Sequence, residues 1–556
     1  MSSLANYFLL LALVVFSLVG CGKSPEAATR QSSTLNPQSS IAPSPVLRLH
    51  WLGKKRLSAE ANATNFISVW NMPESVHLET QTLDKLATAP WRLLKSATPL
   101  SNAPVALLRP LLDDLVQEES YLEIISSTNQ PTEAVFAIKL HSDRAALWQT
   151  NLAIVLHSFS AQSQAPSPKP QDVVSSTVRL LNSEFRLSLS HSGSWTILGI
   201  SDSRLQTQDF RLKNSITARI AATGSPYELT TTNNWIAGDI DFAWLKRVRG
   251  WQSVADAALP RADFTVIGTG DAVRTSAKFT FPTKAPIEIE PWNIPTNLVH
   301  DPLIGFTTAR GFRPMLKSLS LWNEAIFGAT PNQITFWVQD GHPALRFSAF
   351  PSHQATNQMR LMTDYMLNSV NPALSVFPNT TNLPVGSFES LPDGRGLRWR
   401  GFPFIMPRLE LAGPETNEFI TAGLFPNRVT NRLAPESLRD QFQNDPGLLL
   451  YDWEQTQPNT FALIQISQAT RFIFGKNRLS ITNNPALPWL VAVSPRLGNA
   501  GTSIRLASPD VLSFSRTSTL GLTGTELHLL TEWLESPDFP QGFFSLNPSK
   551  PPTTPP

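Results

Sequence analysis

Three residues near the start of the chain, Gly22-Lys23-Ser24, match the end of a phosphate-binding loop. That motif needs a further glycine at the position of Ser17, because backbone N–H groups must approach the phosphate oxygens closely. It also needs a helix that begins at the lysine, with its N-terminal dipole facing the phosphates. A proline-rich polar stretch (25–45) follows instead. The sequence therefore predicts no nucleotide site here.

Two acidic residues, Asp239 and Asp241, alternate along the stretch 238–244 (GDIDFAW). On a strand this spacing places both carboxylates on one face, where they could hold a cation or act as a catalytic pair. The same alternation on a half-buried strand turns them towards water while Ile240 and Phe242 face inward. We favour the solvent-facing interpretation.

The histidines and glycine-rich turns offer no other recognisable catalytic pattern. No two of the 9 histidines have the His-x-x-x-His spacing that places two imidazoles on one helical face for zinc. No Gly-x-Ser-x-Gly elbow occurs, and 191–195 (HSGSW) and 501–505 (GTSIR) come nearest. The stretch 266–273 (VIGTGDAV) begins like a dinucleotide fingerprint, but Val273 replaces the third glycine, so we predict a hairpin turn at Gly268–Asp271. These patterns indicate no catalytic, cofactor-binding or metal-ligating residue and no cofactor.

The 15 tryptophans are another possible signal, because exposed Trp can stack on sugars or lie among lipid headgroups. Most of them lie within apolar or alternating runs, where burial in a core is the expected outcome. We therefore predict a core role for Trp148, Trp195, Trp235, Trp244 and Trp337.

The N-terminal region contains an apolar segment followed by a cysteine. Residues 7–20 are apolar except for Ser17, which suits the h-region of an export signal and is short for a membrane span. Residues 18–21 (LVGC) follow the lipobox pattern, so residues 1–22 resemble the signal of bacterial lipoproteins. The resemblance implies that Cys21 receives a diacylglyceryl group on its sulfur and becomes the mature N-terminus after cleavage. An uncleaved N-terminal anchor and an apolar first strand stay open as alternatives.

Composition narrows the choice of partners. Cys21 is the one cysteine in 556 residues, so the chain forms no internal disulfide and no thiolate metal cluster. Lys+Arg 45 against Asp+Glu 43 gives a net charge of +2, which provides no electrostatic basis for binding nucleic acid. The length exceeds what one hydrophobic core usually supports, so two or more domains are expected.

Proline-rich stretches mark the expected domain boundaries. We predict a signal peptide (1–20), a lipidated Cys21 with a disordered linker (21–46), a first domain (47–281), a connector (282–296), a second domain (297–545) and a disordered tail (546–556).

The two halves show a similar order of predicted elements. Two strands (121–126 and 134–140) precede a helix from Ser142 in the first half, and two strands (334–339 and 344–350) precede a helix near 354–370 in the second. The stretch 235–245 aligns with 448–454, and the second helix has an apolar stripe of Met359, Met362, Met366 and Val370. We also expect Pro90 and Pro110 to break their helical segments, and Thr523 with Glu526 to form a capping box. The predicted class is α+β: antiparallel sheets with helices packed on one face, in two similar domains in tandem.

These observations favour a lipid-anchored lipoprotein of the cell envelope, with its body outside the cytoplasm on the periplasmic side. We expect a non-enzymatic binding or scaffold module that contacts the membrane through its lipid anchor and binds an envelope protein, lipid or glycan. The alternative is an envelope hydrolase that acts on a carbohydrate or lipid through a site assembled from distant residues.

Overall fold

The structure, a computed structural model, describes residues 44–540 with internal gaps. The gaps are 94–99, 127–131, 160–173, 181–182, 203–210, 228–233, 250–257, 319–321, 342–343, 376–385, 402–405, 415–417, 426–431, 434–441, 443–444, 474–484 and 537–538. The predicted signal peptide, Cys21, most of the predicted linker and the predicted tail lie outside the described residues.

The chain forms two compact units. Unit 1 runs to Trp251 and includes Arg261–Asp271 and the chain from Trp533, and unit 2 comprises Gln252–Pro260 and Ala272–Glu532. These bounds differ from the predicted 47–281 and 297–545. One reason is that β9 (Val273–Thr280) pairs along its length with β19 (Val511–Ser518) of unit 2.

Two segments pack on a different part of the protein than the sequence predicted. The chain from Trp533, predicted as part of the second domain, belongs to unit 1, and the predicted connector packs on unit 2. Lys85 Nζ of unit 1 lies 3.0 Å from Glu535 Oε2. The connector (282–296) packs on unit 2, where Trp292 and Ile294 contact its hydrophobic core. Gln333 Oε1 accepts a hydrogen bond of 2.8 Å from the backbone N–H of Asn293. The prolines of this segment therefore exclude a helix without making it a free linker.

Unit 1 contains one antiparallel sheet with the strand order β8-β7-β1-β2-β3-β6-β5-β4. Its elements are β1 (Pro45–Trp51), α2 (Lys54–Leu57), α3 (Thr64–Trp70), α4 (Pro73–Leu93), α5 (Val105–Gln117), β2 (Ser120–Ile125), β3 (Glu133–Lys139), α6 (Ser142–His157), β4 (Val174–Leu180), β5 (Ser183–Ser192), β6 (Trp195–Asp202), α7 (Arg211–Thr223), β7 (Ile236–Asp241), α8 (Phe242–Arg249) and β8 (Arg261–Gly268).

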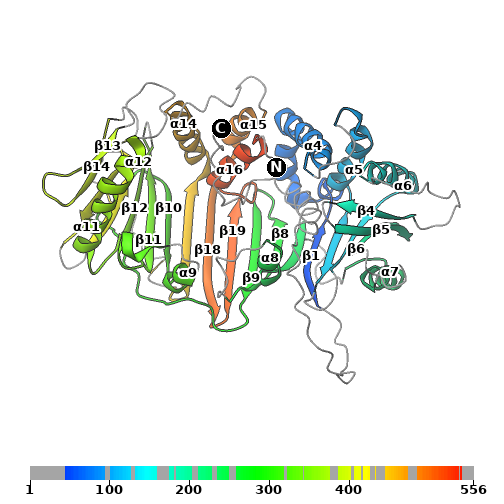
Figure 1. Cartoon of the computed structure of the whole chain (residues 1–556), viewed down its shortest axis with the longest axis horizontal. Coiled ribbons are helices and arrows are strands. Elements are labelled where there is room, and N and C mark those ends of the chain that lie inside the picture. Colours follow the sequence, from blue (N-terminus) through cyan, green and yellow to red (C-terminus); the bar gives the residue numbers. More distant parts are fainter. Residues whose placement is uncertain are drawn as a thin grey trace, which may run out of the picture. The chain divides into compact units, whose positions relative to one another are not determined.

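Helices cover both faces of the unit 1 sheet (Figure 1). Val135 faces Ile216 of α7 in one core cluster, whereas the next residue, Phe136, stacks on Trp148 of α6 with ring centroids 6.3 Å apart. Neighbouring residues of a strand point to opposite faces, so α6 and α7 lie on opposite sides. Gly238 of β7 allows the close pairing with β1, because a Cβ there would collide with the Arg48 carbonyl oxygen.

Unit 2 contains an antiparallel sheet with the strand order β9-β19-β18-β17-β10-β11-β12-β16-β15-β14-β13 (Figure 1). Its other elements are β10 (Leu303–Arg310), α9 (Arg313–Ser318), α10 (Glu324–Phe327), β11 (Gln333–Gln339), β12 (Leu345–Pro351), α11 (Ala355–Tyr365), the π-helical turn η5 (Met366–Val370), α12 (Asn371–Ser375), β13 (Ser387–Ser390), β14 (Gly396–Arg400), β15 (Arg408–Ala412), β16 (Phe419–Gly423), β17 (Leu448–Gln455), α14 (Thr456–Ile473), α15 (Ala486–Val493), β18 (Asn499–Ser508) and α16 (Gly524–Leu534).

In unit 2 the helices α11 and α14 share one face of the sheet, which we call the helical face. Met359 of α11 packs against Ile420, and Ala462 of α14 packs against Val338. The opposite face forms a second core, in which Trp337 and Phe306 meet residues of the connector.

The two units repeat one strand order. The strands β18-β17-β10-β11-β12-β16-β15-β14 follow one another in unit 2 as β8-β7-β1-β2-β3-β6-β5-β4 do in unit 1. The alignment of 235–245 with 448–454 places β7 opposite β17, as the shared order requires. The predicted α+β class with antiparallel sheets and the two similar domains are thus confirmed. The prediction that helices pack on one face was wrong for unit 1, because the residues of β3 are buried on both faces and α6 and α7 cover opposite sides of the sheet.

Of the predictions made from short motifs, the capping box was confirmed and the helix breaks were not. The capping box is confirmed, since Glu526 N–H donates to Thr523 Oγ1 and Thr523 N–H donates to Glu526 Oε2. The expected helix breaks were wrong, because α4 continues through Pro90 and α5 through Pro110. A proline inside a helix costs about 3 kcal/mol or more. Buried neighbours, such as Trp91 beside Pro90, provide packing that offsets this cost.

Candidate functional site

The structure places the predicted acidic pair in structural roles. Asp239 is buried between two arginines: Arg48 Nε lies 2.5 Å from its Oδ2, and Arg261 pairs with its Oδ1. Asp241 caps α8 by accepting the Ala243 backbone N–H at 2.8 Å. The solvent-facing interpretation was therefore wrong for Asp239. Its strand lies beside β1, and the register sets Arg48 directly opposite it.

The tryptophans have the predicted core role. All five of the residues singled out are buried, namely Trp148, Trp195, Trp235, Trp244 and Trp337. A turn does occur at Gly268–Asp271, with Gly270 at a φ of 96° that favours glycine. The predicted hairpin was wrong, because β8 pairs with β7 and β9 pairs with β19. This segment thus has a conformational role.

A first cluster of charged residues surrounds Glu119 in unit 1. Its carboxylate lies 3.2 Å from His50 Nε2 and accepts hydrogen bonds from the Tyr227 hydroxyl at 2.6 Å and from Arg56 NH1 at 2.8 Å. Lys139 Nζ lies 3.5 Å from Glu119 Oε2. Burial alone would raise the pKa of Glu119, but the hydrogen bonds and the charge of Arg56 outweigh it and lower the pKa to about 2. We call these five residues the Glu119 cluster.

Sequence reasoning did not find the Glu119 cluster. Its members come from separate elements, and no spacing along the chain connects His50 to Glu119 and Tyr227. The pairing of β1 with β2 brings His50 to the start of β2, next to Glu119. A strongly partnered carboxylate with a low pKa stays ionised, so the geometry supports a stabilising role.

A second acidic pair, Asp452 and Glu454, occupies β17, the counterpart of β7. Asp452 accepts a hydrogen bond of 2.6 Å from Thr307 Oγ1. Glu454 accepts from the Gly524 backbone N–H and, at 2.5 Å, from Asn459 Nδ2. Burial raises the pKa of both carboxyl groups, against these hydrogen bonds. Glu454 is thus buried and Asp452 partly buried, and both carboxyl groups are partnered and harder to ionise than usual.

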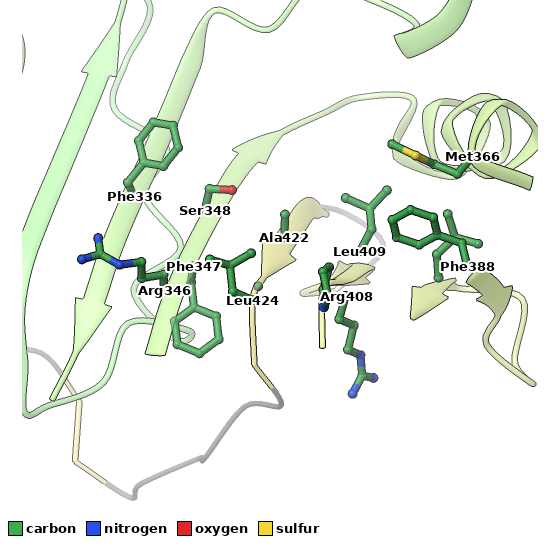
Figure 2. A pocket seen from close by; sticks show the side chains of 13 residues that line it. Phe336, Arg346, Phe347, Ser348, Met366, Phe388, Arg408, Leu409, Ala422 and Leu424 are labelled. Carbon is green, nitrogen blue, oxygen red and sulfur yellow. The ribbon is translucent and has the colours of Figure 1, made fainter. Parts of the chain in front are cut away.

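An apolar pocket of about 370 Å³ lies in unit 2 (Figure 2). Much of its floor is a cross-strand row on the helical face: Phe336, Ser348, Ala422, Leu409 and Leu397. Met366 of η5 and Phe388 of β13 line it as well, and the remaining lining residues are Arg346, Phe347, Pro407, Arg408, Gly423 and Leu424. This volume falls in the range of about 300–1,000 Å³ that is typical of small-molecule sites.

The two arginines of the pocket differ in direction. In Figure 2 the side chains of Phe347 and Arg408 point to the opposite side from Ser348 and Leu409. Arg408 also pairs with Glu410. Arg346, by contrast, shares the helical face with Ser348, and its guanidinium extends beside Phe336. Arg346 is therefore the cation that belongs to this face of the pocket.

The described residues contain no cluster of three or more His, Cys, Asp or Glu side chains suited to holding a metal ion. Within the same part of the chain, no helix combines the length and apolar character needed to cross a membrane. No protein-family model, curated protein or solved structure matches the chain.

We expect Glu119→Gln to lower the free energy of unfolding of unit 1 at pH 7 by about 1.5–3 kcal/mol, the usual range for hydrogen bonds to charged groups. The folded pKa of Glu119 is depressed, so its contribution is present above its unfolded value of 4.5 and is lost as the pH falls towards 2. Hydrogen exchange of β1 and β2 peptides between pH 2 and 7 provides the measurement. A variant with the wild-type pH dependence would contradict this role.

For Asp452 we expect the stability to change with pH in the opposite direction from Glu119. The folded pKa of Asp452 is raised, so the stability of unit 2 decreases as the pH rises through that value and the partly buried carboxyl loses its proton. Asp452→Asn keeps an acceptor for Thr307 and removes the charge. We expect urea unfolding of the variant at pH 7 to show a stability equal to or above that of the wild type, with a weaker pH dependence above pH 4. A loss of stability at pH 7 would contradict the expectation.

Proposed function

We propose that the chain is a lipid-anchored protein of the cell envelope that binds an apolar ligand in the unit 2 pocket, with its body on the periplasmic side. The observation that carries the proposal is the lining of this pocket by aliphatic, aromatic and thioether side chains. Burying apolar surface of a ligand against such a lining contributes roughly 25 cal/mol per Å². The pocket thus has the chemistry of a binding site for hydrocarbon.

The anchor is the part of the proposal that the sequence supports. The lipobox at 18–21 and the single cysteine of the chain, Cys21, fit attachment of a diacylglyceryl group. Two or more acyl chains hold a protein at a bilayer far more firmly than one, because each buried CH₂ contributes about 0.8 kcal/mol. An anchored protein would meet acyl lipids at high local concentration, which agrees with an apolar pocket.

The alternative, an envelope hydrolase acting on a carbohydrate or lipid, has one observation in its favour. Asp452 and Glu454 have raised pKa values, as general acids do. Their oxygens, however, accept hydrogen bonds from Thr307, Gly524 and Asn459, which stabilise the strand and the start of α16. We therefore favour binding over hydrolysis.

The anchor is tested by expressing the full chain in a bacterial host beside Cys21→Ala. We expect the native protein to begin at Cys21 with the added mass of a diacylglyceryl group and to enter the detergent phase on partitioning. The variant should lack the lipid mass and stay in the aqueous phase. An unmodified N-terminus in the native protein would overturn the anchor.

The pocket is tested with the neutral dye Nile red. Ala422 lies in the middle of the pocket floor, so Ala422→Trp should fill the cavity and weaken dye binding about tenfold or more. Ala325→Trp, at an exposed position of α10, is the matched control and should bind like the wild type. Fluorescence titration gives the affinities, and circular dichroism checks folding. Equal binding by both variants would place the dye elsewhere and contradict the proposed site.

A further inference from the structure

We infer that the ligand of this pocket is a single acyl chain with an anionic head group, and that Arg346 binds the head group. The inference rests on the proposed function, because it names the ligand class for the same pocket. It follows from Arg346, which lines the apolar pocket and whose Nε has no hydrogen-bond partner among the described residues.

Arg346 lies at the boundary between the pocket and helix α14. It stands opposite Val338 in the β11–β12 register and so belongs to the helical face. Its NH2 donates a hydrogen bond of 2.8 Å to Asn459 Oδ1 on α14. Its Nε is buried and has no hydrogen-bond partner among the described residues. Burial lowers the pKa of Arg346, and the charge of Glu454 offsets this effect in part.

The carboxylate of Glu454 does not contact the guanidinium of Arg346, because the side chain of Asn459 lies between them. Glu454 reaches Arg346 through Asn459, whose amide donates to Glu454 and accepts from Arg346. Charges removed from water in proteins are usually paired with an opposite charge, because an unpaired one is costly to desolvate. No carboxylate within the described part of the chain lies in ion-pair contact with Arg346. A direct anionic partner is thus still to be supplied.

Arg310 shows how unit 2 satisfies an arginine with a purely structural role. Its guanidinium donates to the carbonyl oxygens of Leu448, Glu290 and Pro446, and it stacks on Trp292 at 4.4 Å. These contacts occupy all three nitrogens of its guanidinium. Arg346 has a single such contact in the described structure, so it keeps donors for a ligand. A guanidinium suits a carboxylate or phosphate, which it can bind with two parallel hydrogen bonds.

The remainder of the pocket suits a hydrocarbon chain. Figure 2 shows Arg346 beside Phe336 on one side of the labelled residues and Met366 with Phe388 on the other. Met366 begins η5, a π-helical turn that interrupts the helix after β12, and such turns are frequent at functional sites. The thioether adapts readily to different apolar shapes. A chain that extends from Arg346 towards Met366 would bury its methylenes against Ala422 and Leu409.

The test compares four ligands that share one C12 chain: dodecanoate, dodecyl phosphate, dodecanol and dodecyltrimethylammonium. Calorimetric titration of the full chain should give affinities for the carboxylate or the phosphate about tenfold or more above that for the alcohol. The cation should bind more weakly than the alcohol. The better of the two anions identifies the head group, and either one supports the inference.

Arg346→Met should remove the preference for an anion while dodecanol binding is retained, and Arg346→Lys should keep part of the preference. Arg360→Met is the matched control, since Arg360 is exposed on α11 and pairs with Asp364. Equal binding of anion and alcohol by the wild type would overturn the inference and leave the proposed apolar site intact. If none of the four ligands binds and Ala422→Trp has no effect on Nile red, the proposed function fails as well. The wild-type comparison needs no variant, so misfolding of Arg346→Met would not leave the question open.

Discussion

The pairing of the first strand of each unit with a strand that returns much later in the chain is the constraint on which both units depend. In unit 1, β1 pairs with β7, which lies about 190 residues further on, as the contact between Arg48 and Asp239 shows. In unit 2, β10 pairs with β17. Closing such long loops is entropically costly, so the gain must come from the contacts that the pairing brings together. These contacts include buried charges as well as apolar cores.

The charged side chains removed from water differ in how directly an opposite charge or a polar group partners them. Asp239 has two arginines, and Glu119 has a histidine, a tyrosine, an arginine and a lysine. Arg310 is satisfied by backbone carbonyls. Arg346 has an amide, with the carboxylate of Glu454 behind it. A fully partnered network rigidifies its surroundings, and the anionic head group that we infer would complete the partners of Arg346 in the apolar pocket.

The repeated strand order shows that one framework has been used twice with different surfaces. In unit 1, α6 runs unbroken from Ser142 to His157 after β3. In unit 2 the corresponding helix changes to a π-helical turn at Met366, beside the pocket. Asp239 lies on β7 of unit 1, and the counterpart of this strand in unit 2, β17, carries Asp452 and Glu454. Glu454 connects through Asn459 to Arg346. The shared framework thus positions a structural ion pair in one unit and, in the other, a carboxylate that holds Asn459 against an arginine of the pocket.

Periodicity and local motifs determined the elements that lie close together in sequence. The paired strands before α6 and α11, the capping box at Thr523 and the burial of the tryptophans all follow from alternation, helical spacing and side-chain size. The lipobox at Cys21 is likewise a property of adjacent residues, and it stays a prediction. Pro90 and Pro110 show the limit of this reasoning, because packing around α4 and α5 outweighs their local preference.

Only the tertiary structure decided which distant residues meet. The sequence cannot show that Arg48 faces Asp239, that Glu119 collects four partners, or that Arg346 lacks a carboxylate, because strand register and order set these contacts. The pocket is a clear case. Met366 is predicted by its spacing as a member of an apolar helix stripe, yet the turn in the backbone at η5 places it in the lining of the cavity. Side-chain type is local information, whereas concavity and charge compensation arise from segments that the sheet brings together.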